Sequence, residues 1–306
     1  MINEENKVKT TSLQSTLKSL DTEEWLDLHF TRPLGYAWAL LFNKLNVHPN
    51  VVTIISIFLG AAAGVCFYFE SIWINLLGVL LLVWANIYDS CDGQLARMTG
   101  KKTRLGRVLD GFAGDVWFLF IYVAIALRLT STWGIWIWIL CSLAGFIFHG
   151  KQAQLADYYR NIHLFFLKGK SGSELDNSVK LTQEYESISW KDDFIWKLFL
   201  YFYRNYTRSQ ESLTPKFQQL RRQIAEKYND DTLPEDKREK FCEGSRPLMK
   251  WTNILTFNTR AIVLYIGALI GHPWIYPLFE ITVLNIIVFY MHHKHESLCQ
   301  QTIDSL

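Results

Sequence analysis

Four aspartates stand in or beside segments that are otherwise apolar. Asp89 and Asp92 follow the run LLGVLLLVWAN at 76–86, and Asp110 and Asp115 stand near the start of the next apolar segment. An ionised acid near the centre of a bilayer costs about 2.5–3.5 kcal/mol, so several acids together need a compensating partner. A divalent cation is such a partner, and oxygen ligands suit magnesium, manganese or calcium better than zinc or copper. The aspartates therefore indicate a metal site among membrane helices.

The first two aspartates belong to a stripe along one face of a helix, because residues three, four, seven and eight apart share a face. The members of this stripe are Asp89, Asp92, Gly93, Ala96 and Arg97. Small residues let a ligand approach the backbone, and a planar guanidinium suits phosphate. Beyond a basic link, Gly106 and Asp110 are again four residues apart. The alternative is that the acids cap helix ends or pair with the basic link, but capping explains single acids better than a stripe.

Composition indicates a membrane protein with a hydrophilic part. Of its 306 residues 50% are apolar and 15% aromatic, and apolar runs of about 18 residues, long enough to cross a bilayer, recur along the chain. A net charge of +2 without a broad basic face argues against a nucleic-acid partner. Five cysteines without CxxC spacing argue against metal-thiolate sites and a disulfide framework. The polar N-terminus lacks the layout of a cleaved signal peptide.

Six apolar segments are predicted to cross the membrane. They cover residues 51–69, 73–95, 106–127, 133–152, 252–271 and 274–293. The link between the second and third segments carries Arg97, Lys101, Lys102, Arg104 and Arg107. Because basic links favour the cytoplasmic side, six crossings place both termini in the cytoplasm. The expected location is the bacterial inner membrane in preference to the endoplasmic reticulum.

The expected fold class is an all-α polytopic membrane protein with about six transmembrane helices. Residues 1–50 are predicted to form a polar leader and an amphipathic interfacial helix broken near Pro33, and residues 51–152 the first four transmembrane helices. Residues 153–250 are expected to be a cytoplasmic helical insertion, in which the segment at 190–206 has the pattern of a helix lying on the bilayer. Residues 251–306 would supply the last two transmembrane helices and a C-terminal tail.

The spacing of the aspartates resembles the signature of the CDP-alcohol phosphotransferases, which are integral membrane enzymes. The matching pattern is Asp89-x2-Asp92-Gly93-x2-Ala96-Arg97-x8-Gly106-x3-Asp110. The stretch HPNVVT, His48–Thr53, is similar to the Pro-Asn element that opens the first membrane helix in that family. The resemblance covers the membrane core and not the insertion.

This resemblance implies a site with two magnesium or manganese ions, for which Asp89, Asp92 and Asp110 would be ligands. The cytidine diphosphate pocket would add four further residues to the two aspartates of the first helix, namely Gly93, Ala96, Arg97 and Gly106. Similar proteins are homodimers. The implied substrates are a CDP-activated alcohol such as CDP-diacylglycerol and a small alcohol acceptor, and CMP is the product.

One position departs from the family pattern, which ends with a further x3-Asp. This chain has Gly114 at that position, followed by Asp115. A residue five after Asp110 on a regular α-helix points about 140° away from it. A one-residue π-bulge near Gly111 and Gly114 would rotate Asp115 into the site, where it would act as base and metal ligand beside Asp110. The alternative is that Asp115 is a structural acid.

The compact core favours phosphatidyl transfer from CDP-diacylglycerol to a soluble alcohol. A resemblance to phosphatidylinositol-phosphate synthases implies inositol 1-phosphate as the acceptor. Lys151 and Arg260 are the candidates for binding an anionic acceptor, because a cation in or near a span usually faces a polar cavity. The alternatives are an ethanolamine or choline head-group transferase, an inactive CDP-lipid-binding relative, and an ion-coupled transporter. The transporter reading is disfavoured because no internal repeat is visible.

Overall fold

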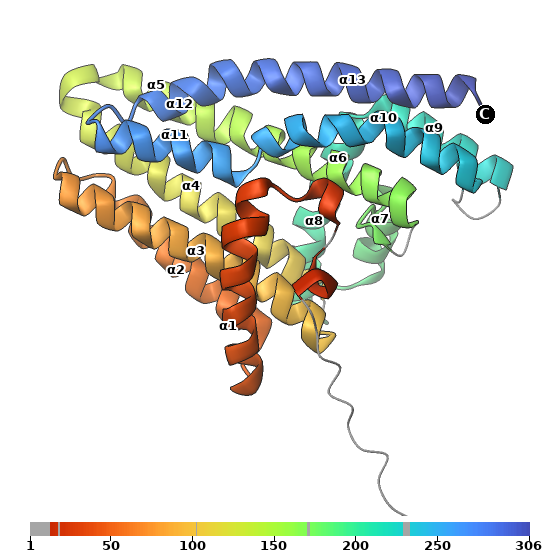
Figure 1. The fold of residues 1–306 in the computed structure, drawn as a ribbon, viewed down its shortest axis with the longest axis horizontal. Helices are drawn as coiled ribbons and strands as arrows, with labels where there is room; N and C mark the ends of the chain where they lie inside the picture. Colours follow the sequence, from red (N-terminus) through yellow and green to blue (C-terminus); the bar gives the residue numbers. More distant parts are fainter. Residues whose placement is uncertain (1–12, 18, 102, 170–171, 229–232) are drawn as a thin grey trace, which may run out of the picture.

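The computed structural model describes residues 13–17, 19–101, 103–169, 172–228 and 233–306 (Figure 1). The first part of the expected polar leader, residues 1–12, lies outside this range, as do Lys102 and the side chain of Arg107. All regular elements in the described part of the chain are helices. The all-α prediction is therefore confirmed.

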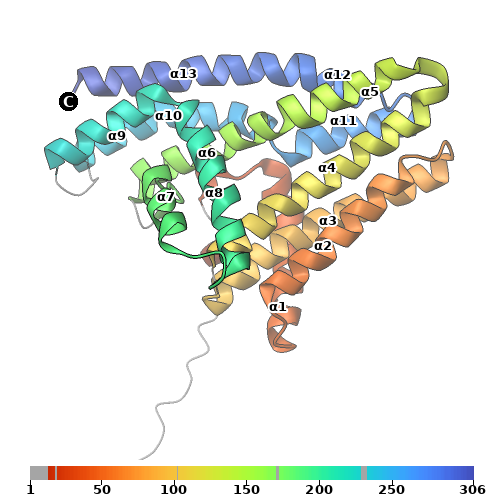
Figure 2. The same cartoon turned by 180° about the vertical axis from the view of Figure 1, so that it is seen from behind.

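Three long helices form the centre of the fold and lie side by side in both ribbon views (Figures 1 and 2). They are α2 (Pro49–Cys66), α3 (Ile72–Thr99) and α4 (Arg104–Trp133). Helix α2 approaches α4 closely at Gly60, where an added Cβ would lie 2.1 Å from Trp117 Cδ1. The glycine therefore sets the spacing between these two helices.

The ends of α3 and α4 that meet at the basic link have clear local causes. Gly100 adopts a left-handed φ of 68° after the last residue of α3, which glycine does at little cost. The Thr103 hydroxyl then accepts a hydrogen bond of 2.9 Å from the amide of Gly106 and so caps α4. This short connection holds the two motif-bearing helix ends together.

In the part of the chain that the structure describes, four helices are long and apolar enough to cross a membrane, namely Pro49–Cys66, Ile72–Thr99, Arg104–Trp133 and Ile275–Asp304. These correspond to the predicted spans at 51–69, 73–95, 106–127 and 274–293. The last one comprises α12 (Ile275–Phe279), a π-helical segment (Glu280–Leu284) and α13 (Asn285–Asp304). The prediction of a polytopic membrane protein is confirmed.

The other two predicted spans have a different form. The segment at 133–152 is helical but irregular: α5 (Ile135–Ser142) passes through a π-helical segment (Leu143–His149) into α6 (Gly150–Lys168), which extends well beyond the expected boundary. The segment at 252–271 is broken at Leu255 and Thr256, and α11 (Phe257–Leu269) has only 13 residues. Thirteen residues rise about 20 Å, too little to cross a hydrocarbon layer of about 30 Å alone.

The remaining helices flank the central bundle. At the N-terminal side a π-helical turn (Asp27–Thr31) leads into α1 (Arg32–Lys44), so that Pro33 lies in the first turn of α1. Within 153–250 the structure has α7 (Ser178–Ser187), α8 (Phe194–Ser212), α9 (Pro215–Tyr228) and α10 (Glu235–Ile254). The second half of α6 packs with α9, α10 and α13 around a core of its own.

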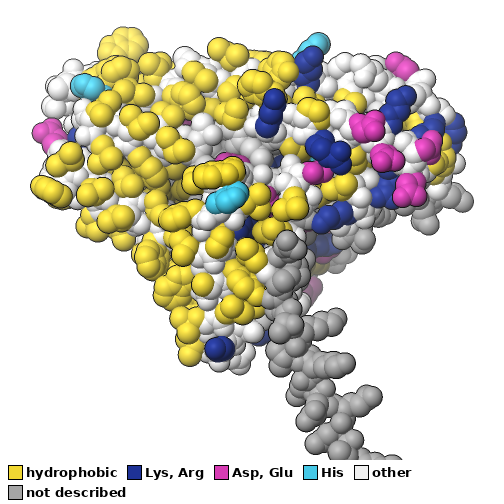
Figure 3. All heavy atoms as spheres, in the orientation of Figure 1, with side chains coloured by type: hydrophobic (Ala, Val, Ile, Leu, Met, Phe, Trp, Pro, Cys, Tyr) yellow, Lys and Arg dark blue, Asp and Glu magenta, His cyan; other side chains and the backbone are white. Residues whose placement is uncertain are grey.

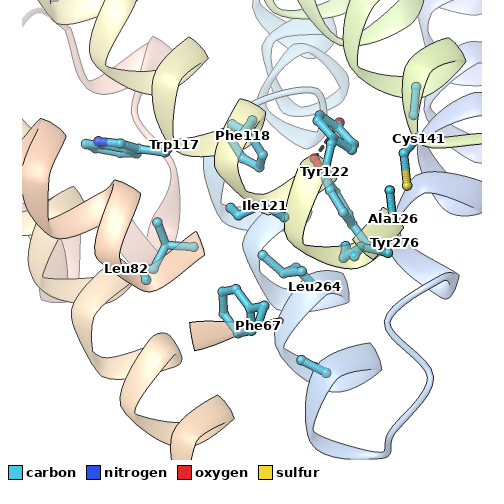
Figure 4. Packing of buried hydrophobic residues seen from close by; sticks show 14 of the residues in the cluster. Phe67, Leu82, Trp117, Phe118, Ile121, Tyr122, Ala126, Cys141, Leu264 and Tyr276 are labelled. Carbon is cyan, nitrogen blue, oxygen red and sulfur yellow. Dashed lines mark hydrogen bonds between the residues drawn. The ribbon is translucent and has the colours of Figure 1, made fainter. Parts of the chain in front are cut away.

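The surface divides into an apolar and a charged part. In Figure 3 hydrophobic side chains cover the part that contains α1 to α5 and α11, whereas charged side chains gather over α9 and α10. The apolar part also has an interior core, in which Phe118, Tyr122 and Tyr276 stack between helices (Figure 4). This division fits a bundle held in lipid with a hydrophilic extension.

Candidate active site

Three of the four aspartates come together between α3 and α4. One carboxylate oxygen each of Asp89, Asp92 and Asp110 lies within 4.8 Å of the other two. Asp92 is buried, Asp89 is half-buried and Asp110 is exposed. Like charges this close repel one another unless a cation or a proton lies between them. The donor set is all oxygen and fits a hard divalent cation, as the sequence predicted.

Helix α2 supplies a third side of the site. The hydroxyl of Thr53, which is buried, donates a hydrogen bond to the carboxylate of Asp92. At Gly106 an added Cβ would lie 3.2 Å from Asn50 Oδ1 and 3.0 Å from Thr103 Oγ1, so a side chain there would crowd this corner. Asn50 and Thr53 were not predicted as site residues. The signals were that both are polar in the first turns of an apolar helix and that both lie in the HPNVVT stretch, which resembles the Pro-Asn element of the family.

Arg97 lies against Gly93 with unused hydrogen-bonding capacity. A Cβ on Gly93 would lie 3.4 Å from both terminal nitrogens of the guanidinium, so the guanidinium lies at contact distance from this position. Among the described residues, Arg97 Nε and Nη2 are buried and have no hydrogen-bond partner. Buried charged donors without a partner are costly, and a planar fork matches phosphate oxygens. The observation therefore supports the predicted role of Arg97 in binding phosphate.

These groups open into one cavity of about 520 Å³, within the usual size range of small-molecule sites. The motif residues in its lining are Asp92, Gly93, Ala96, Arg97, Gly106 and Asp110. Lys101 and Arg104 of the basic link line it as well, and Arg104 also pairs with Glu184 of α7 at 2.7 Å. The sequence prediction that small residues, an arginine and carboxylates share one cleft agrees with this geometry.

A second wall of the cavity comes from the end of α6 and from residues 172–176, which form the wall segment. Its residues are Asn161, Leu164, Lys168, Gly172, Ser173 and Glu174. The amide of Glu174 donates to Asn161 Oδ1 at 3.1 Å, and Arg221 of α9 donates to the carbonyl oxygens of Leu175 and Asp176 at 3.2 Å. The helices of the predicted insertion thus fix one side of the site. Nothing in the local sequence pattern indicated this wall.

The N-terminal segment lies beside the same cavity, because Leu17 is one of the residues that line it. Asp21 pairs with Arg246 at 3.0 Å and with His163 at 3.2 Å. Burial raises the pKa of the Asp21 carboxyl, but hydrogen bonds from Arg246 and His163 outweigh it, so that this pKa lies below its ordinary value. Burial is also the main cause that raises the pKa of Glu24.

Asp115 lies apart from the three-aspartate group. Helix α4 is α-helical from Arg104 to Trp133, so the π-bulge expected near Gly111 and Gly114 is not formed. A regular helix turns Asp115 about 140° away from Asp110. Asp115 is exposed and is not among the residues that line the cavity. Its assignment as base and metal ligand stays a prediction.

Lys151 and Arg260, the predicted acceptor-binding residues, also do not line the cavity. Lys151 is exposed on α6, whereas Arg260 is 1% exposed and lies in a polar cluster inside the bundle. Its guanidinium pairs with Glu280, contacts His149 Nδ1 at 3.1 Å and donates to Gln152 Oε1 at 2.9 Å. The structure thus gives Arg260 internal partners, and the acceptor role of both residues stays a prediction.

Comparison with known proteins shows what part of this chain is similar to. Residues 46–164 match the family model described as CDP-alcohol phosphatidyltransferase. These residues are therefore similar to a CDP-alcohol phosphatidyltransferase domain, and they make up less than half of the chain. The matched stretch contains α2, α3, α4 and most of α6, with all the motif residues, and it ends where the second wall of the cavity begins.

Two curated proteins are similar to this chain over short stretches. An uncharacterized protein of Aquifex aeolicus is 39% identical over 69 residues, which are 22% of this chain and 34% of that protein. A protein of Archaeoglobus fulgidus named bifunctional IPC transferase and DIPP synthase is 36% identical over 87 residues, which are 28% of this chain and 16% of that protein. The chain therefore spans about a third or less of the length of these relatives.

Proposed function

We propose that this chain transfers a phosphatidyl group from CDP-diacylglycerol to the hydroxyl of a small soluble alcohol and releases CMP. The observation that carries the proposal is one cavity at the end of apolar helices. It is lined by Asp92 and Asp110 of the three-aspartate group and by Arg97, whose buried Nε and Nη2 have no hydrogen-bond partner among the described residues. The proposed cofactors are two magnesium or manganese ions, and the proposed acceptor is inositol 1-phosphate. A homodimer with both termini in the cytoplasm is the proposed state in the membrane.

Each side chain of the site has a defined part in this proposal. Asp89, Asp92 and Asp110 would hold the ions, which when bound neutralise the pyrophosphate and stabilise charge on the departing CMP. Arg97 binds a phosphate of the nucleotide, and Thr53 orients the carboxylate of Asp92 through its hydrogen bond. The acceptor oxygen bonds to the phosphorus that carries the lipid, and the bond from that phosphorus to CMP breaks. The hydroxyl proton leaves to a base or to water.

The test is a screen of the purified full-length protein with CDP-diacylglycerol and a panel of alcohols, in the presence of magnesium or manganese. CMP release that depends on both the metal and an added alcohol is the expected result. Release only from CDP-ethanolamine or CDP-choline with a lipid acceptor would instead support the head-group transferase. A protein that binds CDP-lipid without releasing CMP would be the inactive relative.

Replacement of Arg97 by lysine is expected to weaken binding of the CDP-lipid, because an ammonium group cannot reproduce the planar fork. Hydrogen bonds to charged groups contribute about 1.5–3 kcal/mol, so the KM for the CDP-lipid should rise about 10- to 100-fold. Steady-state CMP release measures it. Arg222→Lys, on the exposed side of α9, is the matched control. An unchanged KM in Arg97→Lys would remove Arg97 from the nucleotide site.

Replacement of Arg221 by methionine should release the wall segment, because Arg221 holds the carbonyl oxygens of Leu175 and Asp176. The motif residues of α3 and α4 are proposed to bind the CDP-lipid, so we assign the wall segment to the acceptor. Because a lost charged hydrogen bond costs about 1.5–3 kcal/mol, we expect the KM for the acceptor to rise about tenfold while the KM for the CDP-lipid changes little. The control is Arg222→Met at the neighbouring exposed position. Equal changes in both KM values would show that the segment does not face the acceptor.

A further inference from the structure

Helix α8 turns an apolar face outwards. Six large hydrophobic residues on it are 37–73% exposed. They are Phe194, Ile195, Leu198, Tyr201, Phe202 and Tyr206. Soluble proteins seldom expose a contiguous apolar patch of this kind unless something covers it. Trp190, just before the helix and 43% exposed, extends the same set of aromatic side chains.

Two of the three cationic residues of α8, Lys197 and Arg204, point the other way, towards the protein, whereas Arg208 near its C-terminal end is exposed. Lys197 is 8% exposed, and its ammonium group lies 4.6 Å from the ring centre of Tyr185 on α7. The guanidinium of Arg204 lies 3.7 Å from the centre of the same ring. Both cations are therefore held by aromatic contacts inside the fold. This is the reverse of the arrangement on a water-exposed helix, where charges face the solvent.

The apolar face of α8 continues that of a membrane helix. The inner side of α8 packs through Leu200 and Tyr203 into a cluster that includes Val108 of α4. One turn further along the same stripe of α4, Phe112 is 54% exposed. In Figure 2 α8 runs across the N-terminal end of α4 and not along it, as a helix in the interfacial plane would. Helix α8 thus packs on a segment that is itself long and apolar enough to cross the bilayer.

We propose that α8 lies in the interfacial layer of the bilayer with this face in the lipid. Exposed tyrosine, tryptophan and phenylalanine suit that layer, because their rings tolerate the boundary between hydrocarbon and water. The partner is a lipid surface and not a second protein, because α8 packs against the N-terminal part of α4, a candidate membrane helix that exposes Phe112 there. This inference goes beyond the proposed reaction and does not depend on it.

One hydrogen bond and one ion pair connect α7 and α8 to residues at the cavity. Tyr203 of α8 donates a hydrogen bond to Asp176, at the end of the wall segment. Glu184 of α7 pairs with Arg104, which lines the cavity. The helix therefore holds the second wall of the site at a fixed depth relative to the membrane. This gives the insertion a physical role, since it brings a wall of the site to the lipid surface.

The test is spin labelling of full-length protein in nanodiscs of phosphatidylcholine and phosphatidylglycerol. Ile195→Cys and Phe202→Cys carry the label on α8, and Glu226→Cys on the exposed side of α9 is the aqueous control. The native cysteines are buried except for the half-buried Cys66, and the unmodified protein, treated with label, gives the background. The readout is collision of the label with oxygen, which partitions into lipid, compared with a water-soluble nickel chelate.

The expected result is a ratio of oxygen to nickel collisions that is several-fold higher at 195 and 202 than at 226. Free access of nickel to the labels on α8 would overturn the proposal, because the face would then be in water. Low access of both reagents with spin–spin broadening would also overturn it, because the face would then be covered by a second copy of the chain. The measurement needs no enzymatic turnover, so its outcome is separate from that of the proposed reaction.

Discussion

Replacing Asp92 with asparagine is expected to lower CMP release by about 1000-fold, which corresponds to about 4 kcal/mol of transition-state stabilisation. Asp92 is the buried member of the three-aspartate group and accepts a hydrogen bond from Thr53. The substitution keeps the shape of the side chain but removes the negative charge that a divalent cation requires. Initial rates of CMP release at saturating CDP-diacylglycerol and acceptor measure the effect.

A second measurement separates a binding defect from a folding defect. Manganese binding, followed by the electron paramagnetic resonance signal of the free ion, should weaken in Asp92→Asn while the thermal unfolding midpoint changes little. Asp192→Asn, at an exposed position before α8, is the matched control and should retain full activity. Activity and manganese binding equal to those of the unmodified protein would refute a metal role for Asp92. Asp115→Asn in the same assay tests whether the residue outside the cluster takes part.

Replacing Glu280 with alanine is expected to destabilise the folded protein by about 3–5 kcal/mol, because an uncompensated charge then remains buried. Glu280 is fully buried, and Arg260, its ionic partner, is 1% exposed. The Glu280 carboxylate also accepts a hydrogen bond from Tyr122 and contacts His149 Nδ1 at 2.8 Å. Thermal or denaturant unfolding of the protein in mixed micelles measures the loss.

The double variant Glu280→Met with Arg260→Met sharpens this prediction. Replacing both charged residues leaves no uncompensated guanidinium, so the double variant should have a larger free energy of unfolding than Glu280→Ala alone. The control is Glu186→Ala at an exposed site on α7, for which little change is expected. If Glu280→Ala were as stable as the control, the cluster would contribute nothing to the stability of the bundle.

Much of the membrane core could be predicted from the sequence, because the signals there are local. Apolar runs such as the one at 76–86 identify helices whatever they pack against, and the first three spans have nearly the predicted bounds. The spacing of Asp89, Asp92 and Arg97 places them on one helix face by periodicity alone. Their meeting with Asp110 followed from a link too short to separate the two helix ends.

The irregular helices were beyond such reasoning. Leu255 and Thr256 interrupt a segment whose hydropathy predicts one continuous span. The π-bulge expected in α4 is not formed, and π-helical segments lie instead at Leu143–His149 and Glu280–Leu284. His149 and Glu280 lie at the end and the start of these segments and contact each other at 2.8 Å. The helical irregularities thus coincide with a polar cluster between helices that are far apart in the chain. A local pattern carries no information about that pairing.

The amino-acid sequence alone determined that this protein has apolar helices, one of which carries aspartates and a phosphate-binding type of arginine on one face near its end. Both features could be predicted because helix period and the length needed to cross a bilayer depend only on residues close together in the chain. The tertiary structure decided which side chains complete the site. Thr53 of α2 donates a hydrogen bond to Asp92 of α3, and Arg221 of α9 holds the wall segment. Arg260 forms an ion pair with Glu280 inside the bundle. Each of these contacts joins residues that are distant in the chain. The chain has many other polar residues of the same types, so the sequence alone does not show which of them form the contact. Packing of whole helices selects among them.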